Sequence, residues 1–325
     1  MTDRRAASKP SPASVPSAAG DRPRSARTGR RLGPGGSRGR RRVRIALLLA
    51  PALTVVLTLF AGGLGVGVAQ SFGYLPFLDD WTWNVNAYQA MWQDPAVRAS
   101  FALTGRVALV STAAATILGV CCALLIHRLR RARRVVAAVF ASTLPVPHLV
   151  GAVTMLLLLS QSGLVSRLTH AAGLTQVPAD FPALTADGVG WAIIAEYVWK
   201  ETPFVGVVVL AALSGGIDEL ESAARVLGAS GWQRLRHVVL PLIAPSVAAT
   251  SILVFAFTVG SYEVPLLLGR PFPAALPVVA LQYQRDIDLG TRPEAMAIAV
   301  TIGVLVAALV VVYMAMMDRL VCRSP

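Results

Sequence analysis

The sequence predicts an all-α integral membrane protein whose core is a bundle of six transmembrane helices. Hydrophobic residues make up 55% of the 325 residues, charged residues only 14%, and the mean hydropathy is +0.61. Six apolar runs are each close to the roughly twenty residues that a helix needs to cross a bilayer. Basic residues gather in alternate loops between these runs. A soluble globular protein of this length would carry more polar surface, so that class is excluded.

Residues 1–44 form a basic segment that is predicted to be disordered. The segment holds thirteen Arg or Lys residues against Asp3 and Asp21, which gives +11 of the formal net charge of +13. Because it has almost no large apolar residue, it cannot bury enough surface to offset its chain entropy. It fits either a solvated arm that sets topology or a surface for anionic lipid head groups. Nucleic acid is not an expected partner, since no aromatic residue is interleaved for base stacking.

The predicted transmembrane helices follow in order. The first lies at 45–69, and the other five belong to a transmembrane domain at 97–318, at about 99–126, 136–158, 189–215, 242–262 and 295–317. Pro145 and Pro147 in the third helix and Pro203 in the fourth should kink or unwind it. If the N-terminus is inside, the cytoplasmic segments hold 23 basic residues and the opposite side five. This asymmetry predicts that both termini are cytoplasmic.

The external segment 71–98 is rich in aromatic residues. An aromatic belt at the membrane interface is typical of such a composition, and a docking surface for an external partner is the alternative. The residues concerned are Asp79, Asp80, Trp81, Trp83, Tyr88 and Trp92.

The fourth apolar run carries Glu196, Lys200 and Glu201 near its middle. Ionisable groups at that depth are expensive and usually face protein or water. Glu196 and Lys200 have the i, i+4 spacing of an intrahelical ion pair, which would steady a kinked helix. The alternative is a substrate-pathway role for Lys200 or Glu201. His148, which follows Pro147 in another apolar run, is interpreted as a satisfied core histidine.

A polar stretch at 217–245, IDELESAARVLGASGWQRLRHVVLPLIAP, lies between two apolar runs. Its first part favours a helix, because it is rich in Glu, Leu, Ala and Arg with acids early and Arg225 late. Gly228 can take a positive φ and end that helix. Ser230 and Gln233 have capping-box spacing, so a second short helix should run from there to about Leu240, where Pro241 closes it. The segment 217–241 is therefore predicted to be a helix-turn-helix at the membrane surface.

This stretch resembles the signature loop of type I ABC importer permeases, which follows the pattern E-A-A-x-x-x-G and ends further on in L-P. The motif's Glu falls on Ser222, with acids at Glu219 and Glu221 instead. The run from 262 to 299 is similar to permeases of polyamine, iron or thiamine uptake. The coupling residues that the resemblance marks are Glu221, Ala223, Ala224, Arg225, Gly228, Ala229, Ser230, Leu240 and Pro241.

The resemblance implies a permease subunit of an ATP-driven importer in the cell membrane, which passes a small solute by alternating access. It also implies four partners: two copies of an ATP-binding subunit docked on the 217–241 loop, a second permease chain of the same or a homologous kind, an extracytoplasmic solute-binding protein, and the bilayer. The two lysines of the chain leave no phosphate-binding G-x-x-x-x-G-K-[ST] motif, so ATP hydrolysis is expected on a separate subunit.

No catalytic, cofactor or metal site is predicted, because the four histidines and three cysteines lack ligand spacing. Two other classes of function remain open at this stage. One is an ion-coupled secondary transporter with its ion site on Glu196, Lys200 and Glu201. The other is a membrane scaffold that does not transport.

Overall fold

The computed structural model describes residues 36–76, 82–129 and 131–321, and every regular element in these ranges is helical. The predicted all-α fold is therefore confirmed. The described residues up to Thr58 form one compact unit and those from Leu59 onward form another. The helices are α1 Gly36–Ser71, α2 Asn86–Gln93, α3 Pro95–Arg128, α4 Arg133–Ala141, α5 His148–Leu159, α6 Leu164–Ala171, α7 Trp191–Leu213, α8 Ile217–Val226, α9 Gly231–Arg234, α10 Leu240–Gly260, α11 Glu263–Leu268, α12 Leu276–Gln284 and α13 Arg292–Val321.

The first unit contains the leading part of α1. Its side chains from Val43 to Thr58 are all exposed, and Leu47 is 73% exposed. A helix that shows apolar side chains on every face is suited to a lipid environment. α1 begins at Gly36, so the prediction of disorder is wrong for 36–44, because arginine is a good helix former and the apolar helix extends through it. Residues 1–35 lie outside the described part of the chain.

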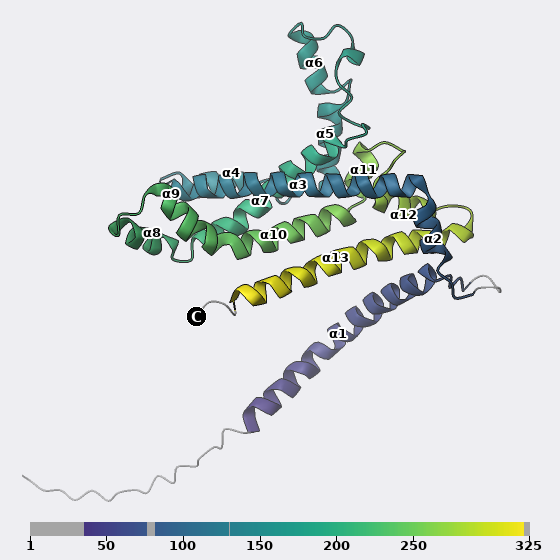
Figure 1. Ribbon diagram of the computed structural model, residues 1–325, viewed down its shortest axis with the longest axis horizontal. Coiled ribbons are helices and arrows are strands. Elements are labelled where there is room, and N and C mark those ends of the chain that lie inside the picture. The colour runs from purple at the N-terminus through teal and green to yellow at the C-terminus, as the bar shows by residue number, and fades with distance from the viewer. Residues whose placement is uncertain (1–35, 77–81, 130, 322–325) are drawn as a thin grey trace, which may run out of the picture. The chain divides into compact units, whose positions relative to one another are not determined.

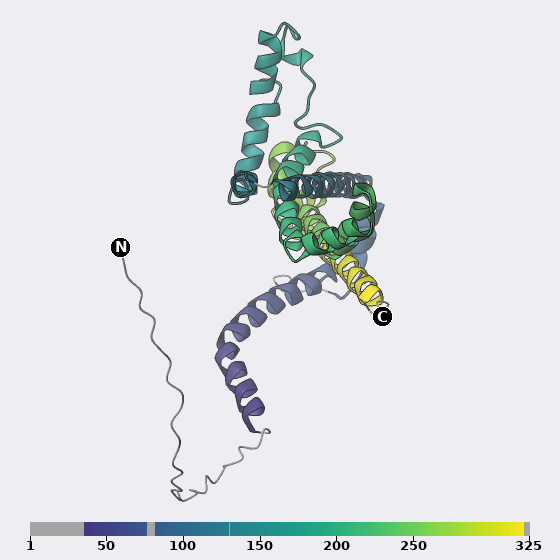
Figure 2. The same ribbon diagram turned by 90° about the vertical axis from the view of Figure 1, so that its left-hand side faces the viewer.

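Four long helices of the second unit, α3, α7, α10 and α13, run side by side (Figure 1). Figure 2 views this bundle along its length. α7 is the central member and packs on both α3 and α10. Gly119 of α3 permits a close approach to α7, since a Cβ there would lie 2.8 Å from the Cβ of Val205. Small residues at such contacts let helix backbones meet in a membrane, where water does not drive packing.

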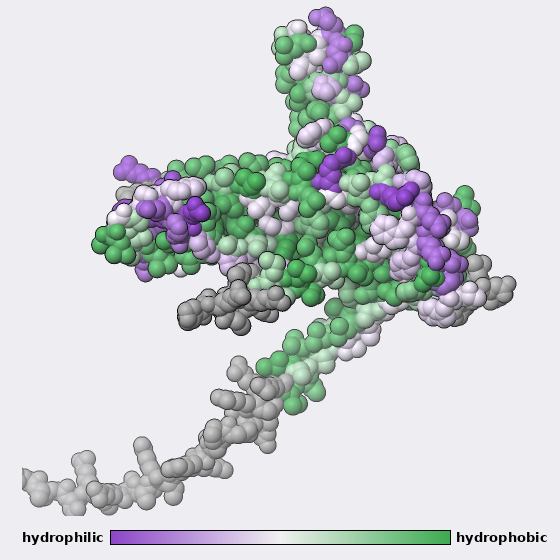
Figure 3. Space-filling view, in the orientation of Figure 1, coloured by the Kyte–Doolittle hydropathy of each residue, from purple (hydrophilic) through white to green (hydrophobic). Residues whose placement is uncertain are grey.

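The sides of the bundle are apolar. Figure 3 shows hydrophobic residues along the long helices and hydrophilic residues gathered toward the two ends. Leu109 and Ile117 of α3 and Val304 of α13 are each more than 60% exposed. Exposed apolar surface on this scale marks contact with a membrane.

Within the described residues, five helical stretches are long and apolar enough to cross a membrane, and a sixth is the α7–α8 pair, which bends by 62°. These numbers agree with the six spans expected from the sequence. The stretches are Val43–Ser71, Pro95–Arg128, His148–Ala171, Gly231–Gly260 and Leu289–Met316.

The helix predicted at 136–158 is interrupted. α4 ends at Ala141, α5 begins at His148, and α5 then turns away from the long helices together with α6 (Figures 1 and 2). Pro145 and Pro147 lie in this interval, and proline both lacks an N–H and disfavours a helical conformation in the residue before it. α7, in contrast, continues through Pro203 as a helix.

The end of the bundle opposite α8 is closed by α2 and α12, which pack on α3 and α13 around Met91, Leu276 and Ile298. The backbone N–H of Leu276 donates to Thr104 Oγ1 over 2.9 Å, which fixes α12 to α3. Two of the aromatic residues expected in a membrane belt have partners here: Trp92 stacks on Phe101, and Tyr88 Oη is 2.8 Å from Ser71 Oγ. Asp79, Asp80 and Trp81 lie outside the described residues.

Candidate functional site

α8 and α9 form a helix-turn-helix at one end of the bundle (Figure 1). α8 begins after Gly216, whose φ of 93° lets the chain leave α7 sharply. Asp218 and Glu219 occupy its first turn and Arg225 its last, as the helix dipole favours. Ile217 is 3% exposed and packs with Leu213 in the bundle core. Ile217 is thus the buried anchor of α8, whose other residues are exposed or half-buried.

The turn between the two helices depends on Gly228, whose φ is 83°. The backbone N–H of Ala229 donates to the carbonyl of Ala224 over 3.0 Å, and that of Gly228 to the carbonyl of Arg225. These bonds satisfy carbonyls that the end of α8 would otherwise leave unpaired. The positive φ predicted from the sequence is confirmed. A Cβ at Gly228 would meet no atom within 4 Å, so backbone conformation alone restricts this position.

The predicted capping box of α9 is also confirmed. The backbone N–H of Ser230 donates to Gln233 Oε1 over 2.8 Å, and the backbone N–H of Gln233 donates to Ser230 Oγ over 3.3 Å. Two donors at the start of the helix are satisfied reciprocally.

The prediction that Pro241 closes the second helix is wrong. A π-helical segment, Leu235–Val239, joins α9 to α10, and Leu240 and Pro241 form the first turn of α10. Proline removes one hydrogen bond and crowds the preceding turn, and the wider π turn ahead of it accommodates both effects. Gly231–Gly260 is consequently one continuous helical stretch.

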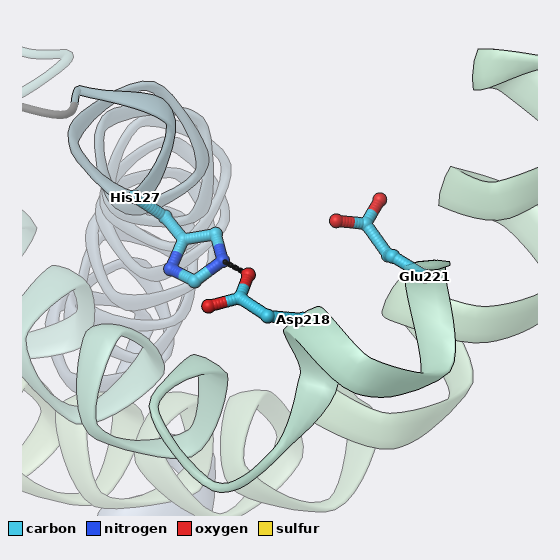
Figure 4. A group of neighbouring side chains, drawn as sticks. All are labelled: His127, Asp218 and Glu221. Atoms are coloured by element: carbon cyan, nitrogen blue, oxygen red, sulfur yellow. Dashed lines mark hydrogen bonds and ion pairs between the residues drawn. The ribbon is translucent and has the colours of Figure 1, made fainter. Parts of the chain in front are cut away.

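Ion pairs and hydrogen bonds hold α8 to its neighbours. Glu221 is 3.9 Å from Arg234 Nε of α9, and His127 Nε2 at the end of α3 is 3.0 Å from Asp218 Oδ1 (Figure 4). Ser222, at the position of the motif's Glu, donates from Oγ to the carbonyl of Asp218 within its own helix. The side chain at that position therefore makes a local bond in place of an outward carboxylate.

His127, Asp218 and Glu221 are of metal-ligating types, and their ligand atoms lie within 4.8 Å of one another. They line a cavity of about 520 Å³ together with Arg128, Arg133 and Arg225. Three guanidinium groups in the same cavity oppose the binding of a cation. The contact between His127 and Asp218 is accounted for by a hydrogen bond.

The far end of the helix-turn-helix carries exposed apolar side chains. Val226 is 88% exposed, Leu227 87% and Trp232 66%. Large apolar residues grouped on an otherwise polar element are typical of a protein contact. The remaining predicted residues, Ala223 and Ala224, lie on α8 just before this apolar end.

A second polar cluster is buried inside the bundle. Glu196 and Glu201 of α7 are 0% and 7% exposed, and both contact His148 at the start of α5. His148 Nδ1 lies 3.2 Å from Glu196 Oε1, and His148 Nε2 lies 3.5 Å from Glu201 Oε1. One imidazole therefore joins two carboxylates, which agrees with the interpretation of His148 as a satisfied core histidine.

Lys200 is 4% exposed, and its Nζ donates to the carbonyls of Thr143 over 2.7 Å and Val146 over 2.6 Å. These carbonyls belong to the interval between α4 and α5, where the helix is broken and its acceptors need other donors. Glu196 and Lys200 are both described in the structure, and the expected ion pair between them does not form. Each group instead has a partner on another element, which periodicity along α7 does not reveal.

Comparisons with known proteins agree on one family. Residues 115–323 match the family model of the binding-protein-dependent transport system inner membrane component. The chain is 32% identical over 181 residues to the inner membrane ABC transporter permease protein YdcU of Escherichia coli. The matched region covers 53% of this chain and 55% of YdcU. It thus spans little more than half the length of this relative.

Other relatives differ in the solutes that their names state. The chain is 27% identical over 279 residues to the trehalose/maltose transport system permease protein MalF of Thermococcus litoralis, covering 82% of this chain and 91% of MalF. It is 31% identical over 121 residues to the spermidine/putrescine transport system permease protein PotC of Escherichia coli. This match covers 37% of this chain and 45% of PotC.

A solved structure of similar fold is the bacterial alginate ABC transporter in complex with an alginate pentasaccharide-bound periplasmic protein. The matched chain has a TM-score of 0.72 at 19% identity, covering 86% of this chain and 96% of that one.

Proposed function

The chain belongs to the family of binding-protein-dependent transport system inner membrane components, and on this premise we propose that α8 and α9 are the surface through which a separate ATPase drives transport. The protein itself is a membrane permease subunit of such a system. The observation that carries the proposal is the exposed helix-turn-helix, whose Gly228 turn and Ser230 cap hold Val226, Leu227 and Trp232 outward. An element built this way presents a fixed shape to a partner.

The proposed orientation places α8, α9 and both termini in the cytoplasm. The support is the excess of basic residues on that side, 23 against five. Arg133 at the start of α4 also lies at this end, where its Nη2 donates to Ser214 Oγ over 3.0 Å. The ATP-binding subunits would approach from this side, and a solute-binding protein from the other.

The route by which the ATPase acts on the membrane domain is proposed to be α10. α9, the π-helical segment and α10 form one helical stretch from Gly231 to Gly260, so a displacement of α9 passes into α10 without a flexible joint. α8 moves with the core through Ile217, which packs against Leu213, Val239 and Ile243. Closure of two ATPases would thereby rock the helices and alternate access to the solute path.

The proposed assembly contains two copies of the ATP-binding subunit, a second permease chain of the same or a homologous kind, and an extracytoplasmic binding protein. The exposed apolar sides of the bundle are compatible with both lipid and a second permease. The family description, which states dependence on a binding protein, supports the last of these partners, and the names of the relatives describe permease proteins of transport systems.

The solute path is proposed to pass the buried cluster on α7. Glu201 contacts His148, whose ring lines a cavity beside the outer end of α10. Lys200 lies behind it and holds the interval between α4 and α5 in place. Glu201→Gln removes a charge with little change in volume, so it should lower transport while assembly and basal ATP hydrolysis remain. Loss of assembly instead would support a purely structural role for this cluster.

Co-purification tests the main proposal. The tagged chain is expressed with its partner subunits and isolated from membranes. Mass spectrometry should identify an ATP-binding subunit in the isolated complex. A separate assay should show that the complex hydrolyses ATP faster when solute-loaded binding protein is added. Replacing Val226 and Leu227 together by Ser should release the ATPase while the permease stays inserted. Retention of a solute-stimulated ATPase in that variant would contradict docking at this end of α8.

A further inference from the structure

A cavity of about 430 Å³ lies where α10 ends and α11 begins. Its volume is within the range of pockets that hold small molecules. α10 provides Phe257 and Gly260, the connection provides Ser261 and Tyr262, and α11 provides Glu263, while His148 forms the wall on the side of α5. The proposed driving element and this cavity therefore lie at opposite ends of the same helical stretch.

The charges around the cavity are predominantly negative. Glu263 lines it directly, and Glu196 and Glu201 lie behind His148 at 3.2 and 3.5 Å from its ring nitrogens. Lys200, the nearby ammonium group, is committed to backbone carbonyls between α4 and α5. The described lining contains no Arg or Lys. Three carboxylates against one ammonium and one imidazole leave an attraction for positive charge.

The aromatic groups of the wall add a second interaction with a cation. The Phe257 ring is 4.7 Å from the His148 ring and meets Tyr197 edge-on at 6.4 Å, which fixes its position. Phe257 and Tyr262 remain 43% and 42% exposed, so their surfaces are available to a ligand. Aromatic faces attract an ammonium group and also contact its methylene chain.

We propose that this cavity is a solute subsite selective for a small aliphatic amine, over a neutral sugar or an anion. The proposal rests on the transport function proposed above. Family membership does not decide the solute, because sugar and polyamine permeases are both among the relatives. A sugar needs several paired donors and acceptors, and the side-chain donors of the described lining are those of His148, Ser261 and Tyr262, with no Asn, Gln, Arg or Lys beside them. A protonated amine brings its own donors to Glu263 and the Ser261 hydroxyl.

Thiol reactivity measures the charge preference without knowledge of the native solute. Cys121, Cys122 and Cys322 are replaced by Ser in the intact complex in detergent, and Ser261→Cys is introduced. Its reaction rates are measured with a cationic reagent, trimethylammonium-ethyl methanethiosulfonate, and with the anionic sulfonato-ethyl analogue. Each rate is divided by that of a free thiol with the same reagent, and the ratio of the two results is the charge preference. We expect about a tenfold preference for the cationic reagent. Glu263→Gln should reduce that preference several-fold.

Ser162→Cys is the matched control, because Ser162 is exposed and its carbonyl accepts from Arg167 Nε at 3.1 Å. It should show no cationic preference. A preference at Ser261→Cys no greater than that of a free thiol, or one that Glu263→Gln leaves unchanged, would overturn the inference.

Protection then separates the solute classes. Millimolar spermidine should slow labelling of Ser261→Cys at least several-fold, and trehalose at the same concentration should not. Protection by trehalose, or none by spermidine, would overturn selectivity for an amine. These rates report on the cavity whether or not the complex transports, whereas solute-stimulated ATP hydrolysis in the same preparation tests the proposed coupling separately.

Discussion

The helix-turn-helix of α8 and α9 and the buried cluster on α7 are both polar, yet different interactions hold them. In α8 and α9 the turn and cap are formed by partners at most five residues apart, such as Ser230 with Gln233 and Ala224 with Ala229. In the cluster, His148 and Lys200 bond to groups 48 to 57 residues away. The exposed element can exchange a lost partner for water, and the buried one cannot. Substitutions in the two regions should therefore differ in cost.

The largest effect on stability is expected for Lys200→Met. The change keeps the length of the side chain but removes the ammonium donor of the half-buried Val146 carbonyl and one of the two donors of the Thr143 carbonyl, which should cost about 1–3 kcal/mol of unfolding free energy. Thermal denaturation of the purified permease in detergent measures this. Thr202→Val is the control, because Thr202 Oγ1 bonds only to Val198 of its own helix and its loss should be nearly neutral. Equal stability of the two variants would break the comparison.

Gly228→Val should have a smaller effect on stability and a large one on coupling. A β-branched residue at a φ of 83° costs about 1–2 kcal/mol, which is too little to unfold the bundle. It should instead rotate α9 against α8, abolish uptake, and either release the ATPase or remove its stimulation by solute-loaded binding protein.

The control for Gly228→Val is Gly231→Val, in the same element. Gly231 has no positive φ, and a Cβ there meets only Arg234 Nη2 at 4.0 Å. Uptake and stimulated ATP hydrolysis should be largely retained in this control. Normal uptake in Gly228→Val would refute α8 and α9 as the coupling element.

A weaker interaction is expected between His127 and Asp218. Asp218 is 76% exposed, and pairs of this kind typically contribute about 0–1 kcal/mol. A double-mutant cycle of His127→Gln and Asp218→Asn, read by thermal denaturation, should give a coupling energy in that range. A coupling as large as the effect of Lys200→Met would show that this end of the bundle behaves like its interior.

The smallest effect concerns an exposed cap in the loop before α7. Asp180 accepts the backbone N–H groups of Gln176 and Val177 at 2.7 and 2.9 Å, and these hydrogen bonds lower the pKa of Asp180 below its ordinary value. A lowered folded-state pKa gives stabilisation that is present above the unfolded pKa and is lost as the pH falls through the folded one.

Hydrogen exchange of the two amides, corrected for intrinsic rates, measures this contribution. Protection should decline only when the pH falls below about 4, and Asp180→Ala should lack it throughout. Protection in Asp180→Ala equal to that of the unmodified chain would show that the carboxylate does not hold this loop.

The sequence by itself determined the helical membrane fold, the positive φ of Gly228 and the capping box of Ser230 and Gln233. Hydropathy and backbone preference act within one helix or turn, so they can be read along the chain. Only the tertiary structure decided that Pro241 continues a helix, because the preceding π turn relieves its crowding. It also decided the partners of Glu196 and Lys200, which face α5 and the interval before it and not each other. In a bundle, a buried charge bonds to whichever element packs against it, and packing is a property of the whole fold.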